Sequence, residues 1–562
     1  MSEAFARLHP AVQHHIVNSL GWRSLRPLQE MAIEPLLLGQ HALLLAPTAG
    51  GKTEAAFFPV LSRMLQGEWP GLSVLYLCPI KALLNNLHLR LQGYGGWVGR
   101  TVALWHGDVS DRDKEVVRRE HPNVLLTTPE SLEVLLTSRR SSPVTMFGGV
   151  QVVVVDELHA FAGDDRGWHM LSVLARIARI AGRPIQRIGL SATIGNPNDL
   201  LNWLAGHAEG ARSVISPPPE RGAQAEIRLD HVGTLDNAAT VISRLHRGEK
   251  RLVFVDSRSR VEQLAAALRS NNVQTFVSHS SVNLDERKQA EAAFSQGSDC
   301  VIVATSTLEL GIDVGDLDRV IQLDAPGSVS SLLQRLGRTG RRPGTLRNCL
   351  FLTTSDDGFL RAAGLLELWA RGYVEPIEPP ATPYHLFAQQ IMALAMQTGG
   401  LVRGEWPTWI GSVPCFSAMG HEAPRILDHM LASGILHEDQ GKIWFGAQGE
   451  KQFGYKNFLE LFSVFTSPPL FTVLHGRTDL GLVHDSTFLG AKGGQSVLLL
   501  GGRSWAVTSI DWQNRKAYVA PAAAGGRSRW CGGSRSLHFD HARAIRRVLA
   551  TGSLAGIPSQ PA

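Results

Sequence analysis

Residues 41–57, HALLLAPTAGGKTEAAF, carry residue types that bind phosphate groups. An apolar run that predicts a buried strand breaks into a glycine-rich turn, and a helix is expected to begin near Lys52. Backbone N–H groups of such a turn and the positive end of the helix form an anion site. Lys52 can reach the outer phosphates of a nucleotide, and the Thr53 hydroxyl can bind Mg²⁺. The alternative, an ordinary glycine-containing turn, is disfavoured by the flanking elements.

Two acids follow another apolar run, VVVV, about a hundred residues after Lys52. Hydrolysis of a phosphoanhydride needs a metal ion, a positioned water and positive charge near the developing oxyanion. We expect Asp156 to hold Mg²⁺ through water and Glu157 to orient and polarise the attacking water. His159 is expected to couple this site to a second lobe. An Asp-Glu pair after a strand is common, so its meaning depends on the phosphate-binding turn.

The positive charge is expected from QRLGRTGR, residues 334–341. Arg338 and Arg341 are three residues apart and would share one face of a helix or turn. Arginines that reach the γ-phosphate only when two lobes close would tie hydrolysis to motion of the lobes. The alternative is a solvated basic helix end. Upstream of the phosphate-binding turn, Gln29 can pair with adenine as donor to N7 and acceptor from N6. A surface glutamine is the alternative there.

Length and composition restrict the class of protein. The chain has 562 residues, enough for about three to five domains, and 44% of them are hydrophobic. The formal net charge of +5 favours an anionic partner. No charge-free run is long enough to span a membrane, and the N-terminus is not a signal peptide, so we expect a cytoplasmic protein. Five scattered cysteines without a C-x-x-C pair argue against a zinc ribbon, an iron–sulfur cluster and a disulfide framework.

Two blocks of alternating strand and helix patterns must position these residues. Fully apolar strands in such blocks predict parallel sheets covered on both faces, with ligands at the carboxyl ends of the strands. The blocks are separated by a proline-rich stretch at 216–220, and only the first has a phosphate-binding turn. One nucleotide between two lobes is therefore expected. A second proline-rich linker occupies residues 375–383.

The remaining third of the chain has a different texture. Residues 384–446 read as helices and a short β-ribbon, which predicts a winged helix or a generic small helical domain. From about residue 455, short β-rich runs with many glycines predict an antiparallel barrel or sandwich. The tail from about 543 is expected to fray. The predicted domains are lobe 1 over 1–216, lobe 2 over 217–376, a winged-helix-like domain over 377–452 and a β-rich domain over 453–562.

The order of the short motifs resembles that of superfamily 2 helicases. The motifs are APTAGGKT, PIKAL, TTPESL, DELH, SAT, LVFVDSR, ATSTLELGIDV and QRLGRTGR. More narrowly, DELHAFAGDDRGWH, GLSATIGNP and PGSVSSLLQRLGRTGR resemble the Lhr family of DEAD/DEAH-box helicases, most strongly over residues 1–370. The last motif departs from many Lhr proteins, which have an alanine and a histidine in that stretch. The resemblance implies an α/β chain with two tandem RecA-like lobes, a winged helix and a barrel-like module.

The resemblance also implies roles for individual residues. The ATP site would comprise Lys52, Thr53, Asp156, Glu157, Gln334, Arg338 and Arg341, with Arg26 and Gln29 at adenine and Thr48, Ala49, Gly50 and Gly51 in the turn. Gly311 and Asp313 would lie by the ribose. The groove for a nucleic-acid strand would be lined by Pro79, Lys81, Thr127, Thr128, Ser257, Arg258, His279, Thr305 and Ser306. Such groups hold phosphates and position a strand without reading its sequence.

Several aromatic and histidine residues have two interpretations. Trp444 on the predicted wing, Trp406 and Trp409 are candidates for stacking on a base, but core packing is the commoner role of such aromatics. Trp505 and Trp512 are expected to face a core. The pair His538 and His541 predicts a capped helix start rather than a metal site, because no further ligands lie at suitable spacing.

Three functional hypotheses follow. The first is a nucleic-acid-dependent ATP hydrolase that acts as a helicase or translocase, moving 3′ to 5′ on single-stranded DNA and separating DNA or RNA–DNA duplexes in DNA repair or genome defence. The second is an ATP-gated clamp that opens and closes without separating strands. The third is the motor subunit of a larger repair or anti-phage complex whose partner carries a nuclease. No nuclease-like acid cluster is recognised in the sequence.

Overall fold

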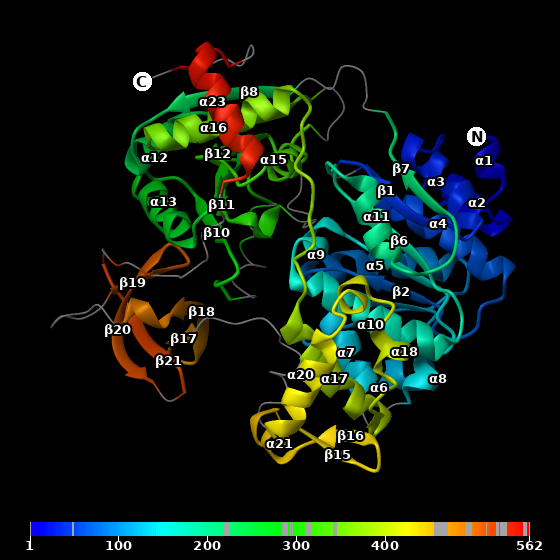
Figure 1. The fold of residues 1–562 in the computed structure, drawn as a ribbon. Coiled ribbons are helices and arrows are strands. Elements are labelled where there is room, and N and C mark those ends of the chain that lie inside the picture. Colours follow the sequence, from blue (N-terminus) through cyan, green and yellow to red (C-terminus); the bar gives the residue numbers. More distant parts are fainter. Residues whose placement is uncertain are drawn as a thin grey trace. The chain divides into compact units, whose positions relative to one another are not determined.

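The computed structural model divides the chain into two compact units. The first contains Met1–Pro218 and Pro376–Thr466, and the second contains Pro219–Glu375 and Ser467–Ala562. Figure 1 shows the elements of each unit in sequence colours. The structure describes residues 2–47, 50–138, 140, 142–218, 225–283, 290, 292, 294, 296–309, 317–340, 345–453, 470–488, 497–512, 514–523, 526, 528, 537–554 and 559–560.

Lobe 1 is a seven-stranded parallel sheet in the first unit, with strand order β3-β4-β2-β5-β6-β1-β7. Its central strands are buried along their whole length because helices cover both faces. The strands are β1 His41–Leu45, β2 Val74–Leu77, β3 Val102–Trp105, β4 Val124–Thr127, β5 Val152–Val155, β6 Gln186–Ser191 and β7 Arg212–Ile215. The helices are α1 Glu3–Ala6, α2 Pro10–Asn18, α3 Pro27–Leu37, α4 Lys52–Gln66, α5 Lys81–Trp97, α6 Asp111–Glu120, α7 Pro129–Thr137, α8 Pro143–Phe147, α9 His159–Ala162, α10 Asp165–Ala181 and α11 Pro197–Ala205.

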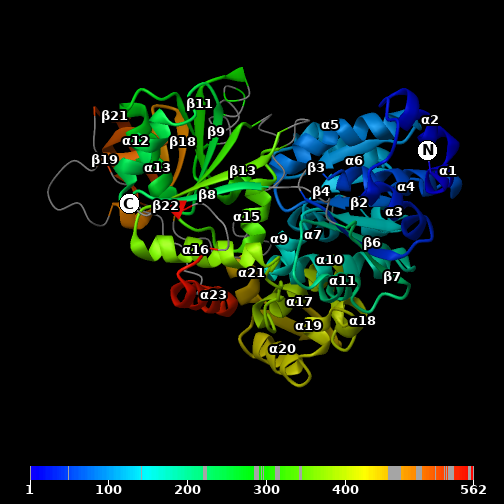
Figure 2. The same ribbon diagram turned by 90° about the horizontal axis from the view of Figure 1, so that it is seen from above.

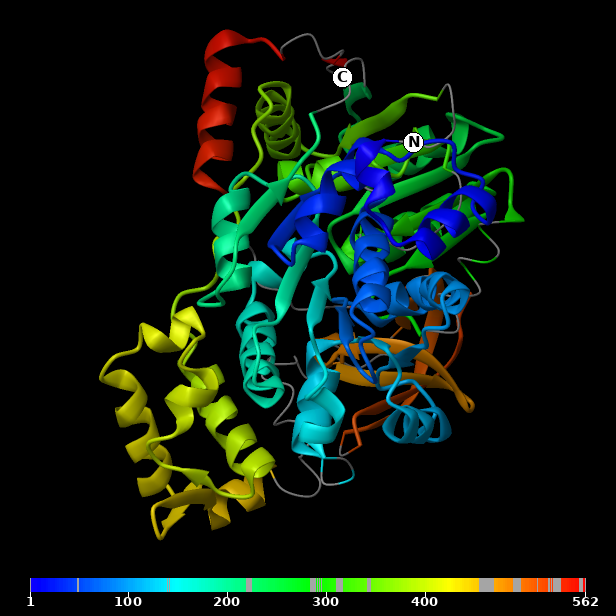
Figure 3. The same ribbon diagram turned by 90° about the vertical axis from the view of Figure 1, so that its right-hand side faces the viewer.

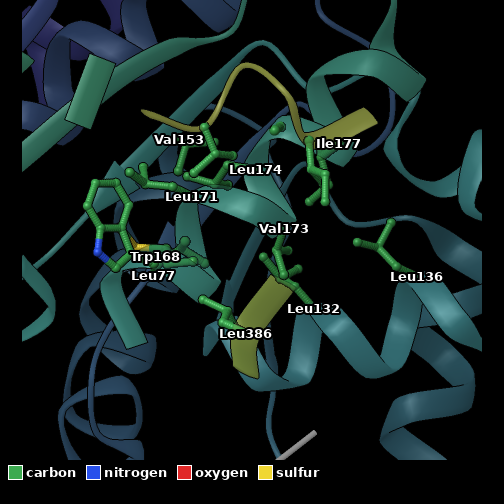
Figure 4. Close-up of a cluster of buried hydrophobic side chains, with 14 of the residues drawn as sticks. Leu77, Leu132, Leu136, Val153, Trp168, Leu171, Val173, Leu174, Ile177 and Leu386 are labelled. Carbon is green, nitrogen blue, oxygen red and sulfur yellow. The ribbon is translucent and has the colours of Figure 1, made fainter. Parts of the chain in front are cut away.

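A helical module completes the first unit. It contains α17 Tyr384–Thr398, β14 Leu401–Val402, α18 Trp406–Ile410, α19 Pro414–Ser417, α20 Glu422–Ala432, β15 Leu436–Asp439, β16 Lys442–Phe445 and α21 Ala447–Phe453. The strands form a small antiparallel sheet in the order β14-β16-β15, so the helices and the β-ribbon expected from the sequence are both present. Figure 4 shows Leu386 of α17 beside Leu132 of α7 and Val173 of α10, so this module shares a hydrophobic core with lobe 1.

Lobe 2 is a second parallel sheet, in the second unit. Its order is β10-β11-β9-β12-β13-β8-β22. The elements are β8 Ala225–His231, α12 Leu235–Arg244, β9 Lys250–Val255, α13 Arg258–Ser270, β10 Thr275–Ser278, β11 Cys300–Ala304, the 3₁₀ turn Ser306–Leu308, β12 Arg319–Leu323, α15 Val329–Leu336, β13 Arg347–Thr353 and α16 Asp356–Ala370. The α/β fold class with two RecA-like lobes is thus confirmed.

A curled five-stranded sheet follows in the same unit, with strand order β18-β17-β21-β20-β19. The β17–β21 pair is parallel and the other pairs are antiparallel, so the sheet is mixed rather than purely antiparallel as expected. Its core contains Phe471, Val473 and Trp505. The strands are β17 Leu470–His475, β18 Thr478–His484, β19 Val497–Leu500, β20 Arg503–Asp511 and β21 Lys516–Pro521, with a 3₁₀ turn at Asp485–Thr487.

The carboxyl-terminal segment differs from the expected frayed tail. Residues Phe539–Thr551 form α23, which runs alongside α16 (Figures 2 and 3). Arg547 of α23 makes two hydrogen bonds of 2.8 Å to Glu367 of α16. The short strand β22, Ser559–Gln560, extends the lobe 2 sheet. His538 caps α23, as the sequence predicted. The composition of the tail did not reveal this amphipathic helix, because the helix is stabilised only when its apolar face packs against α16.

The tryptophans divide between core and surface. Trp505 is buried, and Trp406 and Trp409 pack against the core of the first unit, as expected. Trp512 does not face a core: it is 51% exposed and lies edge-on to Phe471. Within the described residues, no helix combines the length and apolar character needed to cross a membrane.

Candidate functional site

The turn between β1 and α4 has the geometry of a phosphate-binding loop. The Lys52 ammonium donates to the backbone carbonyls of Ala46 at 2.8 Å and Pro47 at 3.2 Å, so it lies over the turn. Gly51, directly before α4, has φ 78°, a left-handed conformation that favours glycine. Thr48 and Ala49 lie outside the described residues, and the sequence prediction for them stands untested.

Gln29 lies against this turn. A Cβ atom at Gly51 would be 2.6 Å from the Gln29 Nε2 atom, so the glycine permits the close approach. The Gln29 Oε1 atom accepts from the Arg26 backbone N–H at 2.9 Å, whereas the buried Nε2 atom has no hydrogen-bond partner among the described residues. A buried donor without a partner is costly, and a purine ring nitrogen would satisfy it. The side chain therefore fits the predicted adenine contact.

The acid pair lies at the carboxyl end of β5. The Tyr76 hydroxyl donates to Asp156 Oδ2 at 2.9 Å, and the Glu157 backbone N–H donates to Asp156 Oδ1 at 2.9 Å. Burial, followed by the charge of Glu157, raises the pKa of Asp156 to about 6. Burial and the charge of Asp156 raise the pKa of Tyr76, and a hydrogen bond with Thr53 acts in the opposite direction. Tyr76 thus connects Thr53 and Asp156, the two oxygen donors predicted for Mg²⁺.

Glu157 and His159 extend the site towards β6. Glu157 has φ 48°, a left-handed conformation that costs a non-glycine residue about 1 kcal/mol or more and is frequent at functional sites. The His159 Nδ1 atom lies 3.1 Å from the Ser191 hydroxyl, and its Nε2 atom lies 3.6 Å from Glu157. Burial, followed by the charge of Lys52, lowers the pKa of His159 to about 4. His159 is therefore neutral near pH 7 and connects the acids to the SAT motif.

In the second unit, the end of α15 and the turn after it carry the arginine motif. Arg335 is buried and donates from Nε to Glu309 at 2.6 Å and from a terminal nitrogen to Asp256 at 2.9 Å. Its guanidinium also lies over the Phe254 ring. Arg338 is only 1% exposed and donates to the backbone carbonyl of Glu309. Gln334 is buried on the same helix. Arg341, Gly311 and Asp313 lie outside the described residues.

The groove residues predicted in lobe 1 follow β2 and β4. Lys81 is exposed and its ammonium is 2.7 Å from Asp108, where this hydrogen bond lowers the carboxyl pKa. The Pro79 carbonyl accepts from Arg166 at 3.0 Å. Thr128 caps α7 through its side chain, and the Thr127 hydroxyl donates to the Trp105 carbonyl at 2.7 Å. A strand contact at Thr127 would therefore rely on its backbone.

The groove residues predicted in lobe 2 follow the neighbouring strands β9, β10 and β11. Ser257 and Arg258 begin α13 and are partly exposed, as is Thr305, and Ser306 is exposed. His279 is different: it is fully buried, and its Nε2 atom is 2.8 Å from Glu262. Trp444, on β16 of the first unit, is 41% exposed.

The two sets of residues divide the carboxyl edge of each sheet. In lobe 1 the groove residues follow β4 and β2, whereas the nucleotide residues follow β5, β6 and β1. In lobe 2 the groove residues follow β10, β11 and β9, and the arginine helix follows β12. Each lobe can therefore contact a nucleic-acid strand and a nucleotide at separate halves of one edge.

Sequence reasoning missed Tyr76 and the ion cluster of Arg335, Glu309 and Asp256. Tyr76 belongs to an apolar strand, VLYL, where nothing marks it as polar in function. Arg335 lies within the arginine motif, and the presence of an arginine at this position was the sequence signal that could have indicated the ion cluster. Its position on the buried face of an eight-residue helix was not visible without the fold.

Comparison with known protein families identifies two domains in the chain. Residues 26–200 match the DEAD/DEAH box helicase family, and residues 234–343 match the helicase conserved C-terminal domain. The Lhr helicase/uracil glycosylase of Escherichia coli is 32% identical over 63% of this chain and 28% of its own length. The chain therefore has the two domains of a DEAD/DEAH box helicase and is similar to Lhr helicases. The ATP-dependent helicase Lhr-Core of Methanocaldococcus jannaschii is 28% identical over 76% of the Lhr-like chain and 54% of its own length.

Solved structures agree with the fold. The structure of the Mycobacterium smegmatis helicase Lhr bound to single-stranded DNA and AMP-PNP has a TM-score of 0.71 and 27% identity, covering 83% of the Lhr-like chain and 63% of that chain. The DUF1998 helicase MrfA bound to DNA and AMPPNP has a TM-score of 0.73 at 21% identity, covers 93% and 73% respectively, and shares the fold. The Lhr-like chain spans about a quarter of the length of the E. coli relative and about half of the length of the M. jannaschii relative.

Proposed function

We propose that this chain is an ATP-driven motor that moves 3′ to 5′ along single-stranded DNA and separates DNA or RNA–DNA duplexes. The observation that carries the proposal is the cluster at the end of β5, where Asp156 and Glu157 lie beside the phosphate-loop residues Lys52 and Thr53. A carboxylate pair next to a phosphate loop supplies the positioning that phosphoanhydride hydrolysis needs. Lhr of M. smegmatis, which binds single-stranded DNA and AMP-PNP, supports the substrate class.

Each residue has a distinct part in this proposal. Lys52 would exchange its bonds to Ala46 and Pro47 for the outer phosphates, and Gln29 would hold adenine. Thr53 and Asp156 would hold Mg²⁺, which supplies charge neutralisation at the phosphates. Glu157 would accept a proton from the attacking water and orient it. Gln334 and Arg338 of lobe 2 would complete the site when the lobes close, with Arg26 near adenine.

Strand contacts are proposed along the groove residues of both lobes. Lys81 is exposed at the start of α5, where an ammonium can bind a phosphate in place of Asp108. Backbone groups and hydroxyls at the ends of β4, β9 and β11 would hold further phosphates. This mode of binding positions the strand without reading bases, so we expect little sequence preference. A role in DNA repair or genome defence, with a nuclease partner, belongs to the same proposal.

The test compares ATP hydrolysis with and without single-stranded DNA. We expect DNA to stimulate the wild-type chain. Glu157→Gln should lower the stimulated kcat by about 10²–10⁴-fold, the range for loss of a positioned acid–base group, and Lys52→Ala by about 10²–10³-fold, the range for loss of one electrostatic donor. Asp111→Asn is the matched control, because Asp111 is fully exposed at the start of α6. A Glu157→Gln variant with wild-type kcat would refute the assignment.

Strand displacement distinguishes the motor from a clamp. A duplex with a 3′ single-stranded tail should be separated, and one with a 5′ tail should not. Hydrolysis without displacement of either duplex would favour an ATP-gated clamp. Displacement that requires a co-purifying nuclease subunit would favour a motor subunit of a larger complex. The same assay with RNA strands establishes which strand the motor follows.

A further inference from the structure

The chain that leaves lobe 2 is anchored to the arginine helix. The Glu375 carboxylate accepts the backbone N–H of Val329, at 2.8 and 3.0 Å from its two oxygens, and that of Ser330 at 3.3 Å. Val329 is the first residue of α15, which carries Gln334 and ends at Leu336, two residues before Arg338. A carboxylate at this end satisfies N–H groups that have no partner within the helix and complements its dipole. Glu375 therefore fixes the start of α15.

Two residues later, the chain is anchored to lobe 1. The Ile377 backbone N–H donates to Asn196 Oδ1 at 2.8 Å, and the Ile377 carbonyl accepts from Asn196 Nδ2 at 3.0 Å. Asn196 follows the SAT motif and directly precedes α11. The Trp168 indole donates to the Pro380 carbonyl at 2.9 Å and secures the chain further along. Ile377 thus holds the loop that begins at Ser191, the residue that contacts His159.

Only Pro376 stands between these two anchors. Proline fixes its own φ and restricts the preceding residue to extended conformations, so this link is stiff. Three residues span at most about 11 Å when fully extended. On the lobe 2 side, the Tyr373 hydroxyl donates to Asp540 of α23 at 2.6 Å, so the segment before Glu375 is also held. The backbone is therefore held by hydrogen bonds on both sides of Pro376 and can extend little.

We propose that Glu375-Pro376-Ile377 is a mechanical strap that couples the SAT loop of lobe 1 to the arginine helix of lobe 2. The inference rests on the proposed ATPase function. A displacement of the SAT loop reaches Ile377 through Asn196, and the short link passes it to the N-terminus of α15 through Glu375. Asn196 and Glu375 are positioning residues, since they act on the site through α15 and the SAT loop.

Lengthening the strap tests this idea without removing either anchor. Insertion of Gly-Ser-Gly between Pro376 and Ile377 keeps every hydrogen bond of Glu375 and Asn196 available. We expect the DNA-stimulated kcat to fall by about 10–100-fold, the range for a catalytic group displaced by about 1 Å. The KM for ATP should change by less than about twofold, because ground-state binding in lobe 1 is retained. The same insertion after Gly476, in the exposed turn between β17 and β18, is the control.

A second pair of variants separates coupling from simple helix capping. Glu375→Gln keeps an acceptor oxygen and should retain most of the stimulated kcat, whereas Glu375→Ala should lose it to the same degree as the insertion. Hydrogen exchange at Val329 and Ser330 should stay slow in the insertion variant and become fast in Glu375→Ala. An insertion variant with wild-type stimulated kcat would overturn the strap. A wild-type chain that hydrolyses ATP without any response to DNA would overturn the proposed function instead, and the coupling with it.

Discussion

Asp156 and His159 show how burial sets protonation in the site. Burial raises the pKa of the Asp156 carboxyl to about 6, with Glu157 adding to the shift, and Lys52 works against it. The same burial lowers the pKa of His159 to about 4, with the charge of Lys52 as the next cause. A neutral His159 can form a hydrogen bond with Ser191 without adding a positive charge next to Lys52. The polar link from the acids to the SAT motif is therefore uncharged at neutral pH.

This gives a prediction for stability against pH. The pKa of a histidine in the unfolded chain is about 6.5, so between pH 6.5 and about 4 the unfolded state binds a proton that folded His159 does not. The contribution of His159 to the free energy of unfolding should therefore fall as pH falls through this window, by at most roughly 3 kcal/mol, whereas Asp156, with its raised pKa, contributes in the opposite direction. His159→Gln should flatten that fall. Urea denaturation of both proteins in the presence of EDTA, at several pH values from 4.5 to 7, measures this difference in slope.

A matched surface substitution makes this test specific. His421 is mostly exposed, with 83% of its side chain accessible, so His421→Gln should leave the pH dependence unchanged. If His159→Gln shows the same slope as the wild-type chain, the histidine is not buried in its neutral form.

At the scale of elements, the curled sheet is docked on lobe 2 by the loop after β10. The Leu482 N–H of β18 donates to the Ser281 carbonyl at 2.7 Å, and Val282 forms a bridge with Gly481. A second contact joins α13 to the β19–β20 turn, where the Gly501 N–H donates to Glu262 at 2.8 Å. Because His279 also bonds Glu262, the predicted groove loop and the docking of the sheet share one buried carboxylate.

Gly481 is the position at which this docking can be broken selectively. A Cβ atom there would lie 1.9 Å from the Ser281 carbonyl oxygen, and the backbone has φ 132°. We expect Gly481→Ala to separate the sheet from lobe 2, with faster hydrogen exchange at 281–283 and 480–482 and an intact lobe 2 core. Gly476→Ala is the control, because it also has positive φ but meets no atom within 4 Å. Equal exchange in the two variants would argue against docking through Gly481.

At the scale of the whole molecule, a buried polar network joins lobe 1 to the helical module within the first unit. Glu133 of α7 accepts from His169 at 3.0 Å and from Gln390 of α17 at 2.7 Å, and it pairs with Arg176. Arg176 also donates to Gln397 at 2.8 Å. Burial would raise the pKa of Glu133, but Arg176 and His169 outweigh it and hold that pKa well below its usual range. The helical module and lobe 1 are therefore expected to unfold together.

Glu133→Gln tests this expectation. It leaves the Arg176 charge buried without its counter-ion, which typically costs about 3–5 kcal/mol. We expect a lower unfolding midpoint and faster proteolysis within residues 376–383, where the module joins the chain. Glu422→Gln, on the exposed pair with Arg425, should change stability by less than about 0.5 kcal/mol. Separate transitions for lobe 1 and the module in the wild-type chain would contradict the shared network.

Local sequence determined the parts of this protein that depend on short-range patterns. The strand-turn-helix around Lys52, the acids after β5 and both parallel sheets follow from apolar runs broken by specific residues. Their periodicity and turn chemistry act over a few residues, so they can be read without a fold. The order of the motifs then favoured two lobes of a helicase.

Only the tertiary structure placed the residues that support those motifs. Tyr76 is an ordinary strand residue until β2 pairs with β5 and brings its hydroxyl to Asp156. The buried carboxylate of Glu262 and the helix α23 become meaningful only beside Gly501 and α16. These contacts join positions far apart in sequence, and their free energy comes from burial, which no local pattern reports. The phosphate-binding loop could thus be predicted from local sequence, whereas the residues that support it are positioned by tertiary packing.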